Sequence, residues 1–135
     1  IVQTHRGAES VLPSICSLCE ITRSAASDMV DKAVIGAHWH RRLLEIDRRS
    51  AEVRAAADAG QFLDVQYADL TGDPISTVQR IYETHGYAYS DKFEERMKQW
   101  LADNRQHKHG LHHYSLEEYD LSADTVRQDF ERVTP

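Results

Sequence analysis

Residues 62–86 read FLDVQYADLTGDPISTVQRIYETHG and decide the class of fold that we expect. Apolar and polar side chains alternate at the start of this stretch, which predicts a strand with one apolar face. The helix expected next has an acid that can cap its first amides, a proline suited to its first position and a glycine suited to its exit. A strand that passes into a helix is typical of α/β proteins. The apolar strand residues are Leu63, Val65 and Tyr67, and the helix signals are Asp73, Pro74 and Gly86.

Helical patterns fill most of the remaining chain. Apolar residues recur at three- and four-residue steps between Met29 and Ala59, which predicts a long amphipathic helix that ends at Gly60. The helix that should begin near residues 8–10 contains Pro13, which is tolerated only in a first turn. The other expected elements are a strand at residues 1–4, a helix after Ser90 or Asp91, a helix after Ser122, a polar loop at 104–113 and a short helix with a Ser115–Glu118 capping box.

These elements place the chain in the α/β class, with a parallel sheet but a mostly helical content. Two strands do not make a stable sheet, and parallel sheets are normally covered on both faces. We therefore expect the two predicted strands to belong to a larger sheet, and the chain to be part of a larger domain.

Composition excludes several classes of partner. The 135 residues are 41% hydrophobic, enough for one modest core, and the formal net charge is −6. Nucleic acids and acidic membranes need clustered Lys and Arg, so neither is an expected partner. No run approaches the roughly 20 apolar residues of a membrane span, and no signal segment stands at the start. We expect a cytoplasmic protein.

Two cysteines, Cys16 and Cys19, form a C-x-x-C pattern inside a helical stretch. A redox pair would favour a strand-to-helix junction, and a zinc site would need two more ligands. The pattern therefore favours two thiols that pack as small hydrophobic side chains.

The opening residues suggest a local anion site. Arg6 should lie just beyond the carboxyl end of the first strand, where open α/β sheets bind ligands. Ser14 should lie about one turn into the next helix, so a guanidinium, a hydroxyl and free helix amides could converge on a phosphate. The alternative is that Arg6 forms a salt bridge with Glu9 or Glu20 and Ser14 is an ordinary helix residue.

Three segments resemble, in order, segments of the bacterial sulfotransferases, which use 3′-phosphoadenylyl sulfate (PAPS) as donor. They read VQTHRGAESVLPSICSL at residues 2–18, the stretch at 62–86, and KHGLHHYSLEEYDL at 108–121. The resemblance implies an enzyme that transfers a sulfuryl group to a hydroxyl or amine and releases adenosine 3′,5′-bisphosphate. It also implies that residues 1–135 are the C-terminal portion of a single sulfotransferase domain with a P-loop-like fold.

The same resemblance implies roles for individual residues. The family holds the 3′-phosphate of the donor with an Arg and a Ser eight positions apart, which Arg6 and Ser14 match. Tyr67 would lie beside the adenine, and a late loop would close over the nucleotide. That loop is matched by Lys108, His109 and Gly110, while His112 and Tyr114 fit the segment that follows it.

Other family features are not matched. The six glycines are scattered singly, so no phosphate-cradling glycine loop is present. No residue before the arginine matches the catalytic base of the family either. We therefore expect no catalytic residue in this chain and no turnover by it alone. Gly7 and Ala8 replace the usual Asp-Pro after the arginine, and Asp120 replaces a usual glycine. The acceptor, a small molecule or a glycolipid, and the oligomeric state are not specified.

Two other functions remain open. The long helix could present its apolar face to a partner, which would make the chain a non-catalytic interaction module. A histidine cluster could bind a metal, although a glycine interrupts it, no carboxylate is spaced as a further ligand, and we expect no metal. The cluster consists of His107, His109, His112 and His113.

Overall fold

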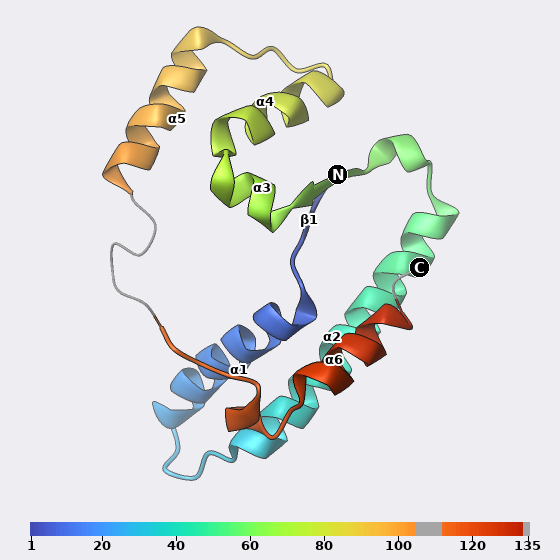
Figure 1. Ribbon diagram of the computed structural model, residues 1–135, viewed down its shortest axis with the longest axis vertical. Coiled ribbons are helices and arrows are strands. Elements are labelled where there is room, and N and C mark those ends of the chain that lie inside the picture. Colours follow the sequence, from blue (N-terminus) through green and yellow to red (C-terminus); the bar gives the residue numbers. More distant parts are fainter. Residues whose placement is uncertain (105–111, 134–135) are drawn as a thin grey trace. The chain divides into compact units, whose positions relative to one another are not determined.

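The computed structural model describes residues 1–104 and 112–133, and it divides into two compact units. The first unit is made of Ile1–Arg6 and Gly60–His112, and the second of Gly7–Ala59 and His113–Pro135. Figure 1 shows the helices and strands of both units. No helix in the described ranges is long and apolar enough to cross a membrane.

The first unit is built on two parallel strands. Strand β1 (Val2–His5) pairs with β2 (Leu63–Gln66), in a register that runs from Val2 opposite Leu63 to His5 opposite Gln66. Both strands were expected from the sequence. Tyr67, however, is the first residue of a helix, α3 (Tyr67–Gly72), that the sequence did not predict. The chain turns there because Thr71 donates its hydroxyl to the Tyr67 carbonyl and the Asp73 amide donates to the Asp69 carbonyl.

The next two helices confirm the predicted end signals. Helix α4 (Pro74–Thr84) begins where the Asp73 carboxylate accepts the Ser76 amide at 3.1 Å, and it ends before Gly86, whose φ of 67° only glycine adopts readily. Helix α5 (Asp91–Asp103) begins where the Ser90 hydroxyl accepts the Phe93 amide at 3.2 Å. The two helices meet through ring contacts among Tyr82, Tyr89 and Phe93.

The second unit is helical. Helix α1 (Ala8–Ser24) packs against α2 (Lys32–Ala56), and α6 (Ala123–Glu131) packs against both, as Figure 1 shows. A short 3₁₀ helix, η2 (Glu117–Tyr119), also lies against α2. The Ser115 amide donates to the Glu118 carboxylate at 3.0 Å, which is one half of the predicted capping box.

The predicted ends of the long helix were wrong. Helix α2 begins later than Met29 because the Asp31 carboxylate caps it by accepting the Val34 amide. It ends at Ala56 rather than at Gly60, because Ala57 is already extended, and residues Ala59–Gln61 form a separate 3₁₀ turn, η1.

The position of Pro13 was also predicted wrongly. Helix α1 begins at Ala8, so Pro13 is inside the helix rather than in its first turn. Proline has no N–H to donate to the carbonyl four residues earlier, which here belongs to Glu9. Pro13 is buried, so its ring contributes to packing while the helix continues through it.

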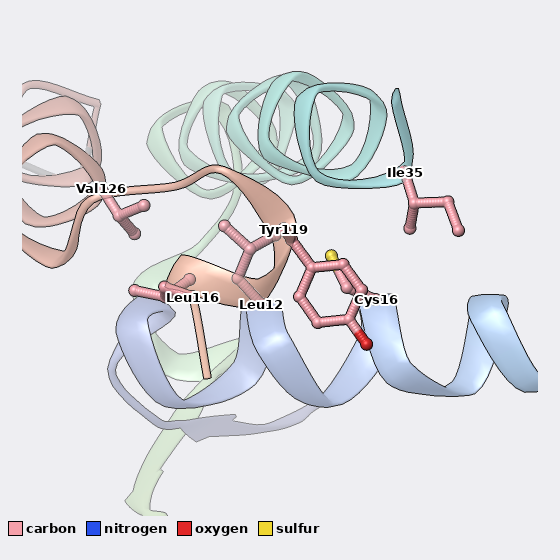
Figure 2. Close-up of a cluster of buried hydrophobic side chains, with 6 residues drawn as sticks. All are labelled: Leu12, Cys16, Ile35, Leu116, Tyr119 and Val126. Carbon is pink, nitrogen blue, oxygen red and sulfur yellow. The ribbon is translucent and has the colours of Figure 1, made fainter. Parts of the chain in front are cut away.

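The core of the second unit gathers side chains from all four of its helices. Figure 2 shows the ring of Tyr119 next to α1, close to Cys16. The Tyr119 hydroxyl donates to Glu20 at 2.8 Å, and Lys32 binds the other oxygen of the same carboxylate at 3.0 Å. The fully or nearly fully buried members are Leu12, Cys16, Ile35, Leu116, Tyr119 and Val126.

Burial raises the pKa of Tyr119, and the hydrogen bonds from Tyr119 and Lys32 lower the pKa of Glu20 below its ordinary value of 4.5. A carboxyl group whose folded pKa is lowered stabilises the fold above its unfolded pKa, and that stability is lost as the pH falls through the folded value. The connection of α1, α2 and η2 through Glu20 is therefore weakened in acid.

The apolar stripe of α2 is only partly covered. Trp39 and Leu43 pack on the core, but Ile46 is 46% exposed and Val53 is 64% exposed. On α5, Trp100 is 63% exposed.

Gly36 is where α2 approaches η2 most closely. A Cβ at this position would lie 2.2 Å from the backbone oxygen of Tyr119, which cannot move without displacing η2. We expect Gly36→Ala to lower the free energy of unfolding by about 1–2 kcal/mol, because overpacking exceeds the gain in helix propensity. Urea unfolding followed by circular dichroism measures this change. The control is Gly72→Ala, where a Cβ meets nothing within 4 Å and no loss is expected; equal losses in both variants would contradict the argument.

Asp120 follows η2 with a φ of 57° and a ψ of 38°, the left-handed conformation that favours glycine. The exit of the short helix thus keeps the backbone of the usual glycine although an aspartate stands there. We expect Asp120→Gly to be more stable than Asp120→Ala by about 1 kcal/mol. Glycine has no Cβ to strain this conformation, whereas alanine has a Cβ and no polar group that can form a local hydrogen bond. Thermal unfolding of the two variants measures this difference, and the opposite order would show that the strain is absent.

Candidate functional site

The candidate site lies where β1 and β2 end. His5 is opposite Gln66 in the last pair of the ladder, so Arg6 and Tyr67 are the residues that directly follow the two strands, Tyr67 as the first residue of α3. Paired residues of parallel strands project to the same face, and successive residues alternate. Arg6 and Tyr67 therefore emerge together at the carboxyl end of the sheet, the end at which open α/β sheets bind ligands.

The two side chains are in contact. The guanidinium carbon of Arg6 lies over the Tyr67 ring, 4.7 Å from its centroid, which is a cation–π arrangement. Arg6 is exposed, and Tyr67 is 37% exposed. Among the described residues of the first unit, no carboxylate lies within ion-pair distance of Arg6. In the second unit, Glu20 is bonded to Tyr119 and Lys32. The N–H groups of Arg6 are thus available for an anion.

A second pair holds the strands together on their other face. The Nε2 atom of His5 lies 2.6 Å from Oδ1 of Asp64. Both side chains are partly exposed and come from neighbouring strands two residues out of register, since Asp64 is paired with Gln3 and His5 with Gln66. Sequence analysis missed this pair. The signal was present, because Gln3 and His5 of β1 and Asp64 and Gln66 of β2 fall on one face once the parallel register is known.

Ser14 and the start of α1 belong to the second unit. Ser14 is half-buried on α1. Gly7 caps this helix with φ −55° and ψ 135° and makes no side-chain cap, and the Glu9 carboxylate lies against it. Because Arg6 and Ser14 belong to different units, their convergence on one phosphate stays a prediction.

The remaining predicted site residues divide in two groups. Lys108, His109 and Gly110 lie outside the described residues. His112 is exposed and Tyr114 is half-buried. The structure thus brings together two predicted site residues, Arg6 and Tyr67, within one unit.

The cysteine pair has the environment predicted for it. Both thiols are free, Cys16 is buried and Cys19 is half-buried. Burial, with a smaller effect from Cys19, raises the pKa of Cys16 to about 11. A thiol with this pKa is protonated near neutral pH and is a poor nucleophile and metal ligand.

The histidine cluster can be assessed only in part. His107 and His109 lie outside the described residues, and His112 and His113 are exposed. Within residues 1–104 and 112–133, no group of three or more His, Cys, Asp or Glu side chains is arranged to hold a metal ion.

Comparisons with known proteins agree with the architecture of the chain. The model of the Sulfotransferase family matches residues 1–91. The omega-hydroxy-beta-dihydromenaquinone-9 sulfotransferase Stf3 of Mycobacterium bovis is 26% identical over 97 residues, which are 68% of this chain and 25% of that protein. The same protein of Mycobacterium tuberculosis gives the same values.

Two solved structures resemble the whole described chain. Sulfotransferase STF9 of Mycobacterium avium superposes with a TM-score of 0.83 at 25% identity, over 95% of this chain and 33% of that one. Sulfotransferase STF1 of Mycobacterium tuberculosis H37Rv superposes with a TM-score of 0.76 at 36% identity, over 96% of this chain and 32% of that one. The chain thus spans 25% of the curated relatives, and the predicted fold class is confirmed.

Proposed function

The chain belongs to the sulfotransferase family, and we propose that it forms the part of such an enzyme that holds the 3′-phosphate and the adenine of PAPS. The observation that carries this proposal is the position of Arg6 and Tyr67 at the carboxyl ends of two adjacent parallel strands. Arg6 has no carboxylate partner among the described residues of its own unit, and a guanidinium in that state is suited to a phosphate.

The reaction proposed for the enzyme is sulfuryl transfer from PAPS to a hydroxyl or amine. The sulfur–oxygen bond to the leaving phosphate breaks, a new bond forms to the acceptor, and the acceptor's proton passes to a base. Charge accumulates on the leaving phosphate, so preorganised cations account for much of the rate enhancement. Arg6, Ser14 and Lys108 would bind and orient the donor away from the transferred sulfur.

We also propose that residues 1–135 are the C-terminal portion of one sulfotransferase domain. Support comes from the coverage of the two solved sulfotransferases, of which the chain spans 33% and 32%. The proposed acceptor is a small molecule or a glycolipid. The curated relative Stf3 is an omega-hydroxy-beta-dihydromenaquinone-9 sulfotransferase, which supports a small lipid-like acceptor.

We expect the chain to bind adenosine 3′,5′-bisphosphate and Arg6→Ala to weaken that binding by at least about tenfold, since a hydrogen-bonded charge contributes about 1.5–3 kcal/mol. Isothermal titration calorimetry measures both dissociation constants. The matched control is Arg96→Ala, which removes an exposed arginine of α5 in the same unit and should leave the affinity unchanged. The absence of saturable binding by the folded chain, or equal affinity of the Arg6 variant, would overturn the proposal.

Ser14→Ala should weaken the same binding less, by about three- to tenfold, because a neutral hydrogen bond contributes about 0.5–1.5 kcal/mol. Adenosine 5′-monophosphate lacks the 3′-phosphate, so the variant should bind it as the parent chain does. The control is Ser50→Ala on α2, which removes a half-buried hydroxyl elsewhere. A Ser14 variant that binds both nucleotides as tightly as the parent would exclude Ser14 from the site.

A further inference from the structure

Tyr67 is in contact with Arg6, and this contact suggests a role beyond a place beside the adenine. The guanidinium lies 4.7 Å from the ring centroid, and the ring is the one recorded side-chain partner of Arg6 among the described residues. An arginine at the end of a strand has several free torsions, so its charge would otherwise sample many positions.

An aromatic ring restrains a cation without consuming its hydrogen bonds. The attraction acts between the positive charge and the negative face of the ring, so no N–H donor of the guanidinium is used. A carboxylate partner would instead occupy the N–H edge that a phosphate needs for a bidentate contact. The ring of Tyr67 is therefore a restraint compatible with anion binding by Arg6.

The backbone fixes both ends of this contact. Arg6 follows His5 and Tyr67 follows Gln66, and these two preceding residues are paired in the ladder. On the opposite face, His5 and Asp64 connect the same strands at 2.6 Å. The Tyr67 ring thus stands at a fixed place relative to the start of the Arg6 side chain.

We infer that Tyr67 is a positioning residue, whose ring holds the Arg6 guanidinium ready for the 3′-phosphate of an adenine nucleotide. The inference rests on the proposed function for the identity of the anion. The ring is sufficient for this role and the hydroxyl is not required. Phenylalanine at position 67 therefore keeps the function, and leucine loses it.

The test compares adenosine 3′,5′-bisphosphate with adenosine 5′-monophosphate in the full chain. The ratio of their dissociation constants isolates the contribution of the 3′-phosphate. We expect Tyr67→Phe to keep this ratio and Tyr67→Leu to reduce it about three- to fivefold, as the strength of an exposed cation–π contact implies. Tyr87→Leu, which removes an exposed tyrosine of the same unit, should keep the parent ratio.

Other outcomes identify what has failed. If Tyr67 contacts only the adenine through its hydroxyl, Tyr67→Phe weakens both nucleotides equally, Tyr67→Leu leaves the ratio unchanged, and the inference is wrong. If the parent chain does not favour the bisphosphate, the proposed function fails instead.

A measurement without any nucleotide then decides the positioning role alone. Ring currents should shift the side-chain proton resonances of Arg6 upfield in the parent chain and in Tyr67→Phe, and the shift should vanish in Tyr67→Leu. Unshifted resonances in the parent chain would overturn the inference independently of the donor.

Discussion

The parallel pairing of β1 with β2 is the constraint on which the candidate site depends. It joins residues about 60 positions apart, with His5 opposite Gln66. The register sets which residue of β1 stands opposite which residue of β2. It therefore brings together Arg6 and Tyr67, the residues that follow His5 and Gln66. A shift of one residue would turn Tyr67 to the opposite face and separate it from Arg6.

The second unit relies on a different kind of interaction. Tyr119 is buried, yet its hydroxyl reaches Glu20, and Lys32 neutralises the same carboxylate. Burying a hydroxyl is unfavourable unless it is hydrogen-bonded, so this small network lets a large aromatic ring fill the centre of the unit. It also connects α1, α2 and η2.

Local signals in the sequence predicted most helix starts, because capping is a contact between neighbours. Asp73 caps the helix that it was expected to cap, and Ser90, one of the two residues after which the next helix was expected, caps that helix. Contacts between distant residues were beyond such reasoning, since the Arg6–Tyr67 contact and the His5–Asp64 pair depend on the strand register. The helix at Tyr67–Gly72 was missed because its first residue, Tyr67, continues the alternation of the strand, while Thr71 and Asp73 turn the backbone. The resemblance named Arg6 and Tyr67 as site residues, and the geometry adds that they touch each other.

The backbone at the junction between β1 and α1 accommodates more than one pair of residues at positions 7 and 8. Gly7 has an extended conformation that any residue adopts, and Ala8 occupies the first helical position, where proline is favoured. The usual Asp-Pro pair and the Gly-Ala pair found here therefore fit the same backbone conformation. A side chain at position 7 would require the Glu9 carboxylate beside Gly7 to move, which a flexible side chain can do. Replacing one dipeptide by the other needs no change in the backbone that positions Arg6 at the end of β1.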